Sequence, residues 1–246
     1  MIAYYATEWD RFASRIIGRW CPSLSGVTGL TIPNTAGGTP AVFSGLDRNT
    51  SWQTSDNKLS ISLPNSGYFS IAYPAINLTA FSISFWFRSR GGNSTQAGIF
   101  SWADSAFSGG PFILLTQQLN NVTRWYVNNG YQLTTTTRQD WDHYSITYNS
   151  NVWRFFLNGS VQSTYSGGLA LQSVASTIYF GSGFSSAANG FADDLILFNG
   201  ALDTTEIQSI YEQGRGGGML YQPPRRRSYF ASATNRRRRV LLTAGS

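Results

Sequence analysis

The stretch 189–214, NGFADDLILFNGALDTTEIQSIYEQG, decides the fold of this chain. Its first half, residues 191–198, is an apolar run that carries two adjacent acids, Asp193 and Asp194, near its start. Apolar runs of this length, bounded by glycine-containing turns, are typical of buried β-strands. We therefore expect a strand here, followed by a tight turn.

The second half of the same stretch carries the start and stop signals of one short helix. Asp203 can cap the N-terminus of the helix, and Glu206, three residues later, can complete a capping box. Gly214 can close the C-terminus, because glycine adopts the left-handed conformation that ends many helices. The sequence thus predicts a strand, a turn and a helix in that order.

Three further segments upstream have the alternation of β-strands. They are residues 81–89 (FSISFWFRS), 141–148 (WDHYSITY) and 153–159 (WRFFLNG). The last of them ends in Asn-Gly, the strongest short signal for a hairpin turn. A hairpin is therefore expected after the third segment.

In this order, the segments resemble the laminin-G-like, concanavalin-A-like jelly-roll family. Members of that family carry an F-S-I-S-F-W-like strand, a W-x-H strand, an N-G hairpin and a G-x-x-D-D strand before "A-L-s-x-x-E-I". Residues 18–38 look like the family's opening strand and loop. The resemblance covers 18–214, and it implies a fold that hosts lectins, adhesion modules, glycosidases and structural domains.

Strand signals separated by turn residues recur through the rest of this region. They fall at 59–63, 68–72, 80–89, 97–103, 112–117, 123–128, 142–149, 152–158, 176–181 and 191–198. This spacing predicts an all-β fold, a two-sheet antiparallel jelly-roll sandwich with one short helix near its C-terminal end. The sandwich domain is expected over 18–214.

Charge is distributed unevenly between this domain and the C-terminal tail, residues 215–246. Residues 1–214 hold ten Arg or Lys and twelve Asp or Glu, a net charge of −2, whereas the tail holds eight Arg and no acid. The tail begins at a Gly-rich joint, 214–218, and beyond it aromatic residues are interleaved with arginines. The residues expected to bind a partner are Tyr221, Arg225, Arg226, Arg227, Tyr229, Phe230, Arg236, Arg237, Arg238 and Arg239.

This combination of aromatic residues and arginine favours protein docking over nucleic-acid binding for the tail. At the other end, residues 1–17 have apolar residues at helical spacing. Two interpretations of this N-terminal arm stay open: a short helix packed on its own domain, or an arm that docks on a neighbouring subunit.

The first residues of the chain, MIAYYATEWD, lack the charged-then-apolar pattern of a leader peptide. No apolar run approaches the length of a membrane span, and the single cysteine, Cys21, cannot form an intrachain disulfide. Laminin-G-like domains usually act outside cells, and a viral protein can leave by lysis without a leader. We therefore expect a virion protein made in a host cytoplasm, with no membrane partner.

Catalytic residues are not evident in the sequence. A glycosidase needs two carboxylates about 5–10 Å apart, whereas Asp193 and Asp194, as neighbours in a strand, would project to opposite faces. His143, the sole histidine, lies where the family pattern has a structural histidine. We therefore predict no catalytic residues and no enzymatic activity.

Asp193 is the one candidate metal ligand. On a regular strand it would share a face with Phe191, Leu195 and Leu197, where a carboxylate must be hydrogen-bonded or bound to a metal. The resemblance implies a structural calcium in this region; the alternative is a hydrogen bond to the opening loop near Asn34. No cofactor is otherwise expected.

Glycan binding on this fold uses aromatic faces with Asn and Asp on loops. The candidates are Trp102, Asp104 and Phe107 in the Gly/Ser-rich loop 101–110, with Trp125 and Tyr131 next. We predict a non-enzymatic structural protein of a phage or viral particle, a capsid decoration or tail-associated subunit, which docks on capsid or tail proteins through its terminal extensions. The alternative is a carbohydrate-binding adhesion module that recognises surface glycans.

Overall fold

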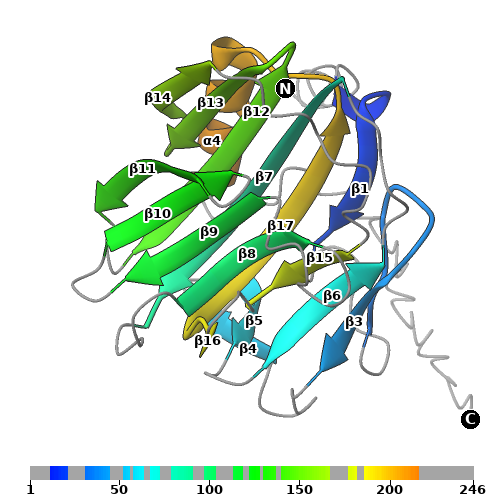
Figure 1. The fold of residues 1–246 in the computed structure, drawn as a ribbon. Coiled ribbons are helices and arrows are strands. Elements are labelled where there is room, and N and C mark those ends of the chain that lie inside the picture. Colours follow the sequence, from blue (N-terminus) through cyan, green and yellow to red (C-terminus); the bar gives the residue numbers. More distant parts are fainter. Residues whose placement is uncertain are drawn as a thin grey trace, which may run out of the picture.

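The computed structural model describes residues 12–21, 31–44, 52–55, 58–63, 67–72, 79–90, 97–103, 113–118, 122–127, 130–136, 140–166, 177–181 and 186–215. Over these residues the chain forms two β-sheets packed face to face and one helix, α4 (Thr204–Arg215), near their C-terminal end (Figure 1). The strand pairs are antiparallel, except one short parallel pair between β16 (Ser186–Ala187) and β8 (Ala97–Ala103). This architecture confirms the predicted jelly-roll sandwich.

Sheet A is the eight-stranded sheet. It contains β1 (Ile16–Trp20), β4 (Trp52–Ser55), β5 (Lys58–Leu63), β7 (Ala80–Ser89), β12 (Trp141–Asn149), β13 (Val152–Leu157), β14 (Ser160–Ser166) and β17 (Gly190–Asn199). Its order is β14-β13-β12-β7-β17-β5-β4. The strand β17 is therefore internal: it pairs with β7 on one side, and with β5 and then β1 on the other.

Sheet B is the nine-stranded sheet. Besides β8 and β16 it contains β2 (Thr31–Ile32), β3 (Ala41–Ser44), β6 (Tyr68–Ala72), β9 (Ile113–Gln118), β10 (Val122–Val127), β11 (Gly130–Thr136) and β15 (Thr177–Phe180). Its order is β11-β10-β9-β8-β15-β6-β3-β2, with β16 added beside β8. Figure 1 shows this sheet lying in front of sheet A.

All ten strand segments predicted from the sequence are present, within one or two residues of the expected ends. The opening strand implied by the family resemblance is β1, although it begins at Ile16 rather than after residue 17. Six strands were not predicted from the sequence, namely β2, β3, β4, β11, β14 and β16. These strands are short or, like β11 and β14, rich in Thr and Ser, so they lack the apolar alternation on which the prediction depended.

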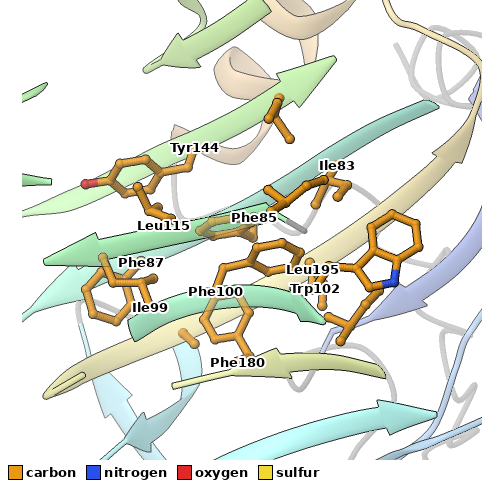
Figure 2. Packing of buried hydrophobic residues seen from close by; sticks show 14 of the residues in the cluster. Ile83, Phe85, Phe87, Ile99, Phe100, Trp102, Leu115, Tyr144, Phe180 and Leu195 are labelled. Carbon is orange, nitrogen blue, oxygen red and sulfur yellow. The ribbon is translucent and has the colours of Figure 1, made fainter. Parts of the chain in front are cut away.

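Between the sheets lies one continuous hydrophobic core that is dense in aromatic side chains. At its centre, Phe85 of β7 contacts rings from both sheets (Figure 2). Its ring centroid lies 5.3 Å from that of Phe100, 4.9 Å from that of Phe180 and 5.7 Å from that of Tyr144. These are offset-stacked and edge-to-face contacts of the kind that aromatic rings prefer, so Phe85 joins sheet A to sheet B.

The predicted hairpin turn joins β13 to β14 at Asn158 and Gly159. Both residues have positive φ, 52° and 78°, as a two-residue type I′ turn requires. The Asn158 side chain also holds β12 in place: its amide donates to Asp142 Oδ1 at 2.9 Å, and its Oδ1 accepts the His143 N–H at 2.9 Å. Asn158 therefore both forms the turn and attaches it to β12, the strand beside β13 in the sheet.

The helix α4 begins with the predicted capping box. The Glu206 N–H donates to Asp203 Oδ1 at 2.8 Å, and the Asp203 N–H donates to Glu206 Oε2 at 2.9 Å. The prediction for Gly214 was wrong, because the helix continues through this residue to Arg215. A Cβ at Gly214 would come within 2.6 Å of the Trp86 indole, so glycine is needed here for close packing and not for the helix end. No helix in the described part of the chain is both long and apolar enough to cross a membrane.

Replacing Asp203 with alanine is expected to lower the free energy of unfolding by about 1 kcal/mol, because one helical N–H loses its acceptor. Asp203→Asn retains an acceptor oxygen and serves as the control, with a loss of a few tenths of a kcal/mol at most. Urea unfolding followed by circular dichroism measures both variants. Equal stabilities for Asp203→Ala and the unmodified protein would contradict the capping role.

Candidate functional site

One end of the outer face of sheet A is closed by α4 and by the N-terminal residues 12–16. A second hydrophobic cluster fills this contact, and its members are Phe12, Phe156, Ile196, Phe198, Leu202, Ile207 and Ile210, with Ile16 beside them. Arg15 ties the N-terminal residues to the helix through a 2.8 Å ion pair with Glu206. For residues 12–17, the structure thus corresponds to packing on their own domain, one of the two arrangements left open for the N-terminal arm.

A serine–histidine pair is buried beneath the helix. Ser84 Oγ and His143 Nε2 lie 2.6 Å apart, and both residues are fully buried. Tyr211 of α4 covers them: its ring stacks on Trp86 at 5.8 Å and lies 6.0 Å from the His143 ring. The pair therefore lies within the contact between helix and sheet, away from solvent.

The two adjacent acids of β17 lie at a β-bulge between Asp193 and Ile196. Asp194 has φ 47°, in the left-handed region, and its N–H donates to Asp193 Oδ1 at 2.9 Å. Because a bulge adds an unpaired residue, it reverses the alternation of the strand. The predicted face of Asp193 was wrong for this reason: Leu195 and Leu197 point into the core, whereas Asp193 pairs across to Trp86 on the outer side.

Asp194 forms a buried, bidentate ion pair with Arg19 of β1. Arg19 Nε donates to Oδ1 at 2.7 Å and Nη2 donates to Oδ2 at 2.9 Å, with both side chains less than a tenth exposed. Burial alone would lower the pKa of Arg19, but the charge and hydrogen bonds of Asp194 raise it, so the guanidinium stays charged. The Arg19 backbone also holds the opening loop, since its N–H donates to Asn34 Oδ1 at 2.9 Å.

The donor set around Asp193 does not suit a calcium ion. Ca²⁺ takes about six to eight oxygen ligands, and the described residues contain no group of three or more His, Cys, Asp or Glu that could hold a metal. The neighbouring carboxylate is already paired with the Arg19 cation, and Asp193 itself lies beside the buried Cys21 thiol, 3.8 Å from its sulfur. The described residues therefore lend no support to a metal site at Asp193.

On the outer face of sheet B, a transverse row of residues crosses eight strands. Residues directly opposite one another in successive strand pairs make up this row. From β11 to β2 they are Tyr131, Tyr126, Leu114, Ser101, Tyr179, Ser70, Val42 and Thr31. The row contains three tyrosines among small and aliphatic residues, and we call it the tyrosine row.

The tyrosine row is accessible at its two ends and buried at its centre. At one end Val42 is 48% exposed, with Ser70 half-buried next to it. At the other end Tyr126 is half-buried, beside the half-buried Arg124 of the adjacent row. Tyr68 extends the first end, since its ring packs edge-on against Tyr179 at 5.8 Å. Each end thus combines an aromatic ring with hydrogen-bonding groups.

The predicted glycan-binding residues fall in three places. The prediction was wrong for Trp102 and Trp125, because both side chains are buried in the core and stabilise the fold. In their strands the large apolar ring turns inward, because burying it stabilises the sandwich more than leaving it in water. Tyr131 lies in the tyrosine row by register, opposite Tyr126. Asp104 and Phe107 lie outside the described residues, as does the whole predicted partner-binding set from Tyr221 to Arg239.

Comparison with known families agrees with this geometry. The family model described as the concanavalin A-like lectin/glucanases superfamily matches residues 63–208, more than half of the chain. The chain belongs to this superfamily. No curated protein matches the sequence of this concanavalin A-like domain.

Solved structures with the same fold include sugar-processing and binding proteins. A Trypanosoma rangeli sialidase in complex with 2,3-difluorosialic acid matches with a TM-score of 0.68 and 11% identity, over 90% of this chain and 39% of the sialidase. Domain 4 of AbnA, a GH43 extracellular arabinanase from Geobacillus stearothermophilus in complex with arabinotriose, matches with a TM-score of 0.59 and 12% identity, over 80% and 98%. The binding domain of botulinum neurotoxin serotype D matches at 0.62 and 17%, over 83% and 53%. The concanavalin A-like domain spans less than two fifths of the sialidase chains it matches.

The prediction that the protein is not an enzyme is contradicted by these matches. Several of the similar structures are sialidases, and one is a domain of an arabinanase. The prediction relied on finding no suitably placed pair of carboxylates in the sequence. At 10–12% identity, the matches establish a shared lectin-like fold.

Proposed function

We propose that this protein is a carbohydrate-binding module that holds glycans on the outer face of sheet B. The observation that carries the proposal is the tyrosine row, because its accessible ends place aromatic rings beside hydrogen-bonding side chains on a broad sheet. Domain 4 of the arabinanase supports it: this chain matches 98% of that domain, which is in complex with arabinotriose. The whole fold of one sugar-bound module is therefore contained within the chain.

Each end of the tyrosine row suits a sugar ring for a physical reason. The apolar face of a tyrosine can pack against the C–H groups of a sugar, while its hydroxyl accepts or donates a hydrogen bond. Next to Tyr126, Arg124 of the adjacent row is a further source of donors for sugar hydroxyls. An exposed face with few buried polar contacts gives weak binding, and we expect a Kd of about 0.1–1 mM per site.

The predicted role as a virion subunit is a separate question. It depends on the terminal extensions and on the expected location in a particle. Residues 12–17 pack against the sandwich, and the chain beyond Arg215 lies outside the described residues. Docking through the C-terminal tail onto capsid or tail proteins therefore stays a prediction, and it is compatible with display of a glycan-binding domain.

A glycan array, followed by calorimetry on the best ligand, tests the proposal. Arabino-oligosaccharides and sialylated glycans belong on the array, since they correspond to the sugars of the similar structures. Tyr126→Ala should weaken binding about tenfold, equivalent to roughly 1.4 kcal/mol, because the ring platform is removed. Val42→Lys should weaken binding to the other end, since it places a long charged side chain on an exposed position.

Arg154→Ala is the matched control. Arg154 is exposed on sheet A, the opposite sheet from the tyrosine row, so this change should leave affinity unaltered. Thermal melts should show that all three variants fold. No bound glycan on the array, or binding that survives both Tyr126→Ala and Val42→Lys, would refute the proposed function.

A further inference from the structure

The chain contains four Asn-Gly pairs, which begin at Asn129, Asn158, Asn189 and Asn199. An Asn-Gly pair is chemically labile, because glycine has no side chain to hinder the attack of its backbone nitrogen on the asparagine side chain. Asn129 lies outside the described residues; of the other three, Asn158 and Asn189 are half-buried and Asn199 is exposed. The fold therefore gives chemically equivalent pairs different surroundings.

The Asn158 side chain is held by the hairpin in which it lies. Its amide nitrogen donates to Asp142 Oδ1, and its Oδ1 accepts the His143 N–H, both at 2.9 Å. Gly159 is buried under α4, since a Cβ there would collide with the Gln208 side chain. Both hydrogen bonds would have to break before the side-chain carbon of Asn158 could reach the Gly159 nitrogen.

Asn199 is restrained only through its backbone. It is the last residue of β17, and its backbone N–H donates to Arg15 O at 2.7 Å. Within the described part of the chain, its side chain makes no hydrogen bond. The attacking nitrogen of this pair is held by one main-chain hydrogen bond, from the Gly200 N–H to Ala80 O at 3.1 Å. The exposed amide of Asn199 can therefore turn toward the Gly200 nitrogen.

We propose that Asn199–Gly200 is a modification site at which the folded protein deamidates without an enzyme. The Gly200 nitrogen loses its proton to solvent and bonds to the side-chain carbonyl carbon of Asn199. The bond from that carbon to the amide nitrogen breaks, and ammonia leaves. Water then opens the resulting cyclic imide at either of its carbonyl groups. The product is an aspartate or an isoaspartate at position 199, and water is the only co-reactant.

The modification site adjoins the link between β17 and α4, which Figure 1 shows at the top of the sandwich. Ser82 Oγ holds this link to sheet A: it donates to Gly200 O at 3.1 Å and accepts the Leu202 N–H at 2.8 Å. Isoaspartate routes the main chain through the former side chain and so adds a carbon just before the link. Because the contacts of Gly200 and Leu202 cannot then all keep their register, the isoaspartate form should hold α4 less firmly.

The test compares two peptides of the full chain by mass spectrometry during incubation at mildly alkaline pH. In buffer, the peptide that contains Asn199 should convert at least about tenfold faster than the one that contains Asn158, because two hydrogen bonds restrain the Asn158 amide. In urea that unfolds the protein, the two peptides should convert at similar rates, since both then carry an unrestrained Asn-Gly pair. A methyltransferase that labels isoaspartate should mark the incubated folded protein at position 199.

Two variants at the exposed position 199 separate the steps. Asn199→Gln has a longer side chain that forms a cyclic imide far less readily, so its melting temperature should stay constant during the incubation. Asn199→Asp carries the charge of one product without the added carbon, so it should melt like the fresh protein, whereas the incubated protein should melt at a lower temperature. Equal conversion of Asn158 and Asn199 in buffer, or no conversion at Asn199 there, would overturn the proposed site. An unchanged melt of the converted protein would overturn the effect on α4.

Discussion

Replacing Phe85 with alanine should lower the free energy of unfolding by about 3–5 kcal/mol, as expected for a fully buried phenylalanine. Phe85 is 0% exposed and contacts Phe100 and Phe180 of sheet B as well as Tyr144 of sheet A. Its loss would therefore leave a cavity at a point where aromatic rings of both sheets meet. In a domain of this size, the midpoint of thermal unfolding should fall by about 10 °C.

Phe191→Ala is the matched control for this substitution, since it removes the same atoms at a half-buried surface position. We expect it to cost about 1 kcal/mol or less. Urea unfolding of both variants measures the difference directly. If the two variants were equally stable, the sheets would not be held together through Phe85.

The second large effect concerns the buried ion pair between Arg19 and Asp194. Asp194→Asn should lower the free energy of unfolding by about 3–5 kcal/mol, because it leaves the Arg19 guanidinium buried without its counter-charge. Asparagine tolerates the left-handed backbone that Asp194 adopts, so the loss would report the charge and not the bulge. Arg19→Met should lower the free energy of unfolding by a similar amount, because it leaves the Asp194 carboxylate buried without its counter-charge.

The double variant Arg19→Met with Asp194→Asn tests whether the two losses share one cause. It should be less destabilised than the sum of the single variants, because neither charge then remains buried alone. A coupling energy above about 1 kcal/mol in this double-mutant cycle would support the pair. Additive losses would show that each residue acts through separate contacts.

Much of the fold was readable from local sequence patterns. The ten strong strand segments, the Asn158–Gly159 turn and the Asp203–Glu206 capping box each depend on residues close together in sequence. The bulge at Asp193 could not be read in this way. It requires one residue, Asp194, to take a left-handed conformation that is stabilised by Arg19, 175 positions away in the chain.

The candidate site was harder to predict because it depends on strand order. The tyrosine row brings Ser101, Tyr179 and Ser70 side by side, in an order that no linear pattern contains. Trp102 and Trp125 were predicted to bind glycans as aromatic rings near polar loops. Every residue of β8 is buried, however, so the alternation of its residues gave no sign of which ring faced outward. In β10 a signal did exist: Trp125 and Val127 alternate with the polar-tipped Tyr126.

The central place of β17 in sheet A has a consequence for how the protein is made. β7 ends at Ser89 and its partner β17 begins only at Gly190, so a ribosome adding about 5–20 residues per second needs roughly 5–20 s between them. Throughout that time β7 lacks its neighbour on one side, and an unpaired apolar strand edge invites association with other chains. Chaperone dependence of the newly synthesised chain should therefore end abruptly once β17 has emerged, whatever the stability of the finished sandwich.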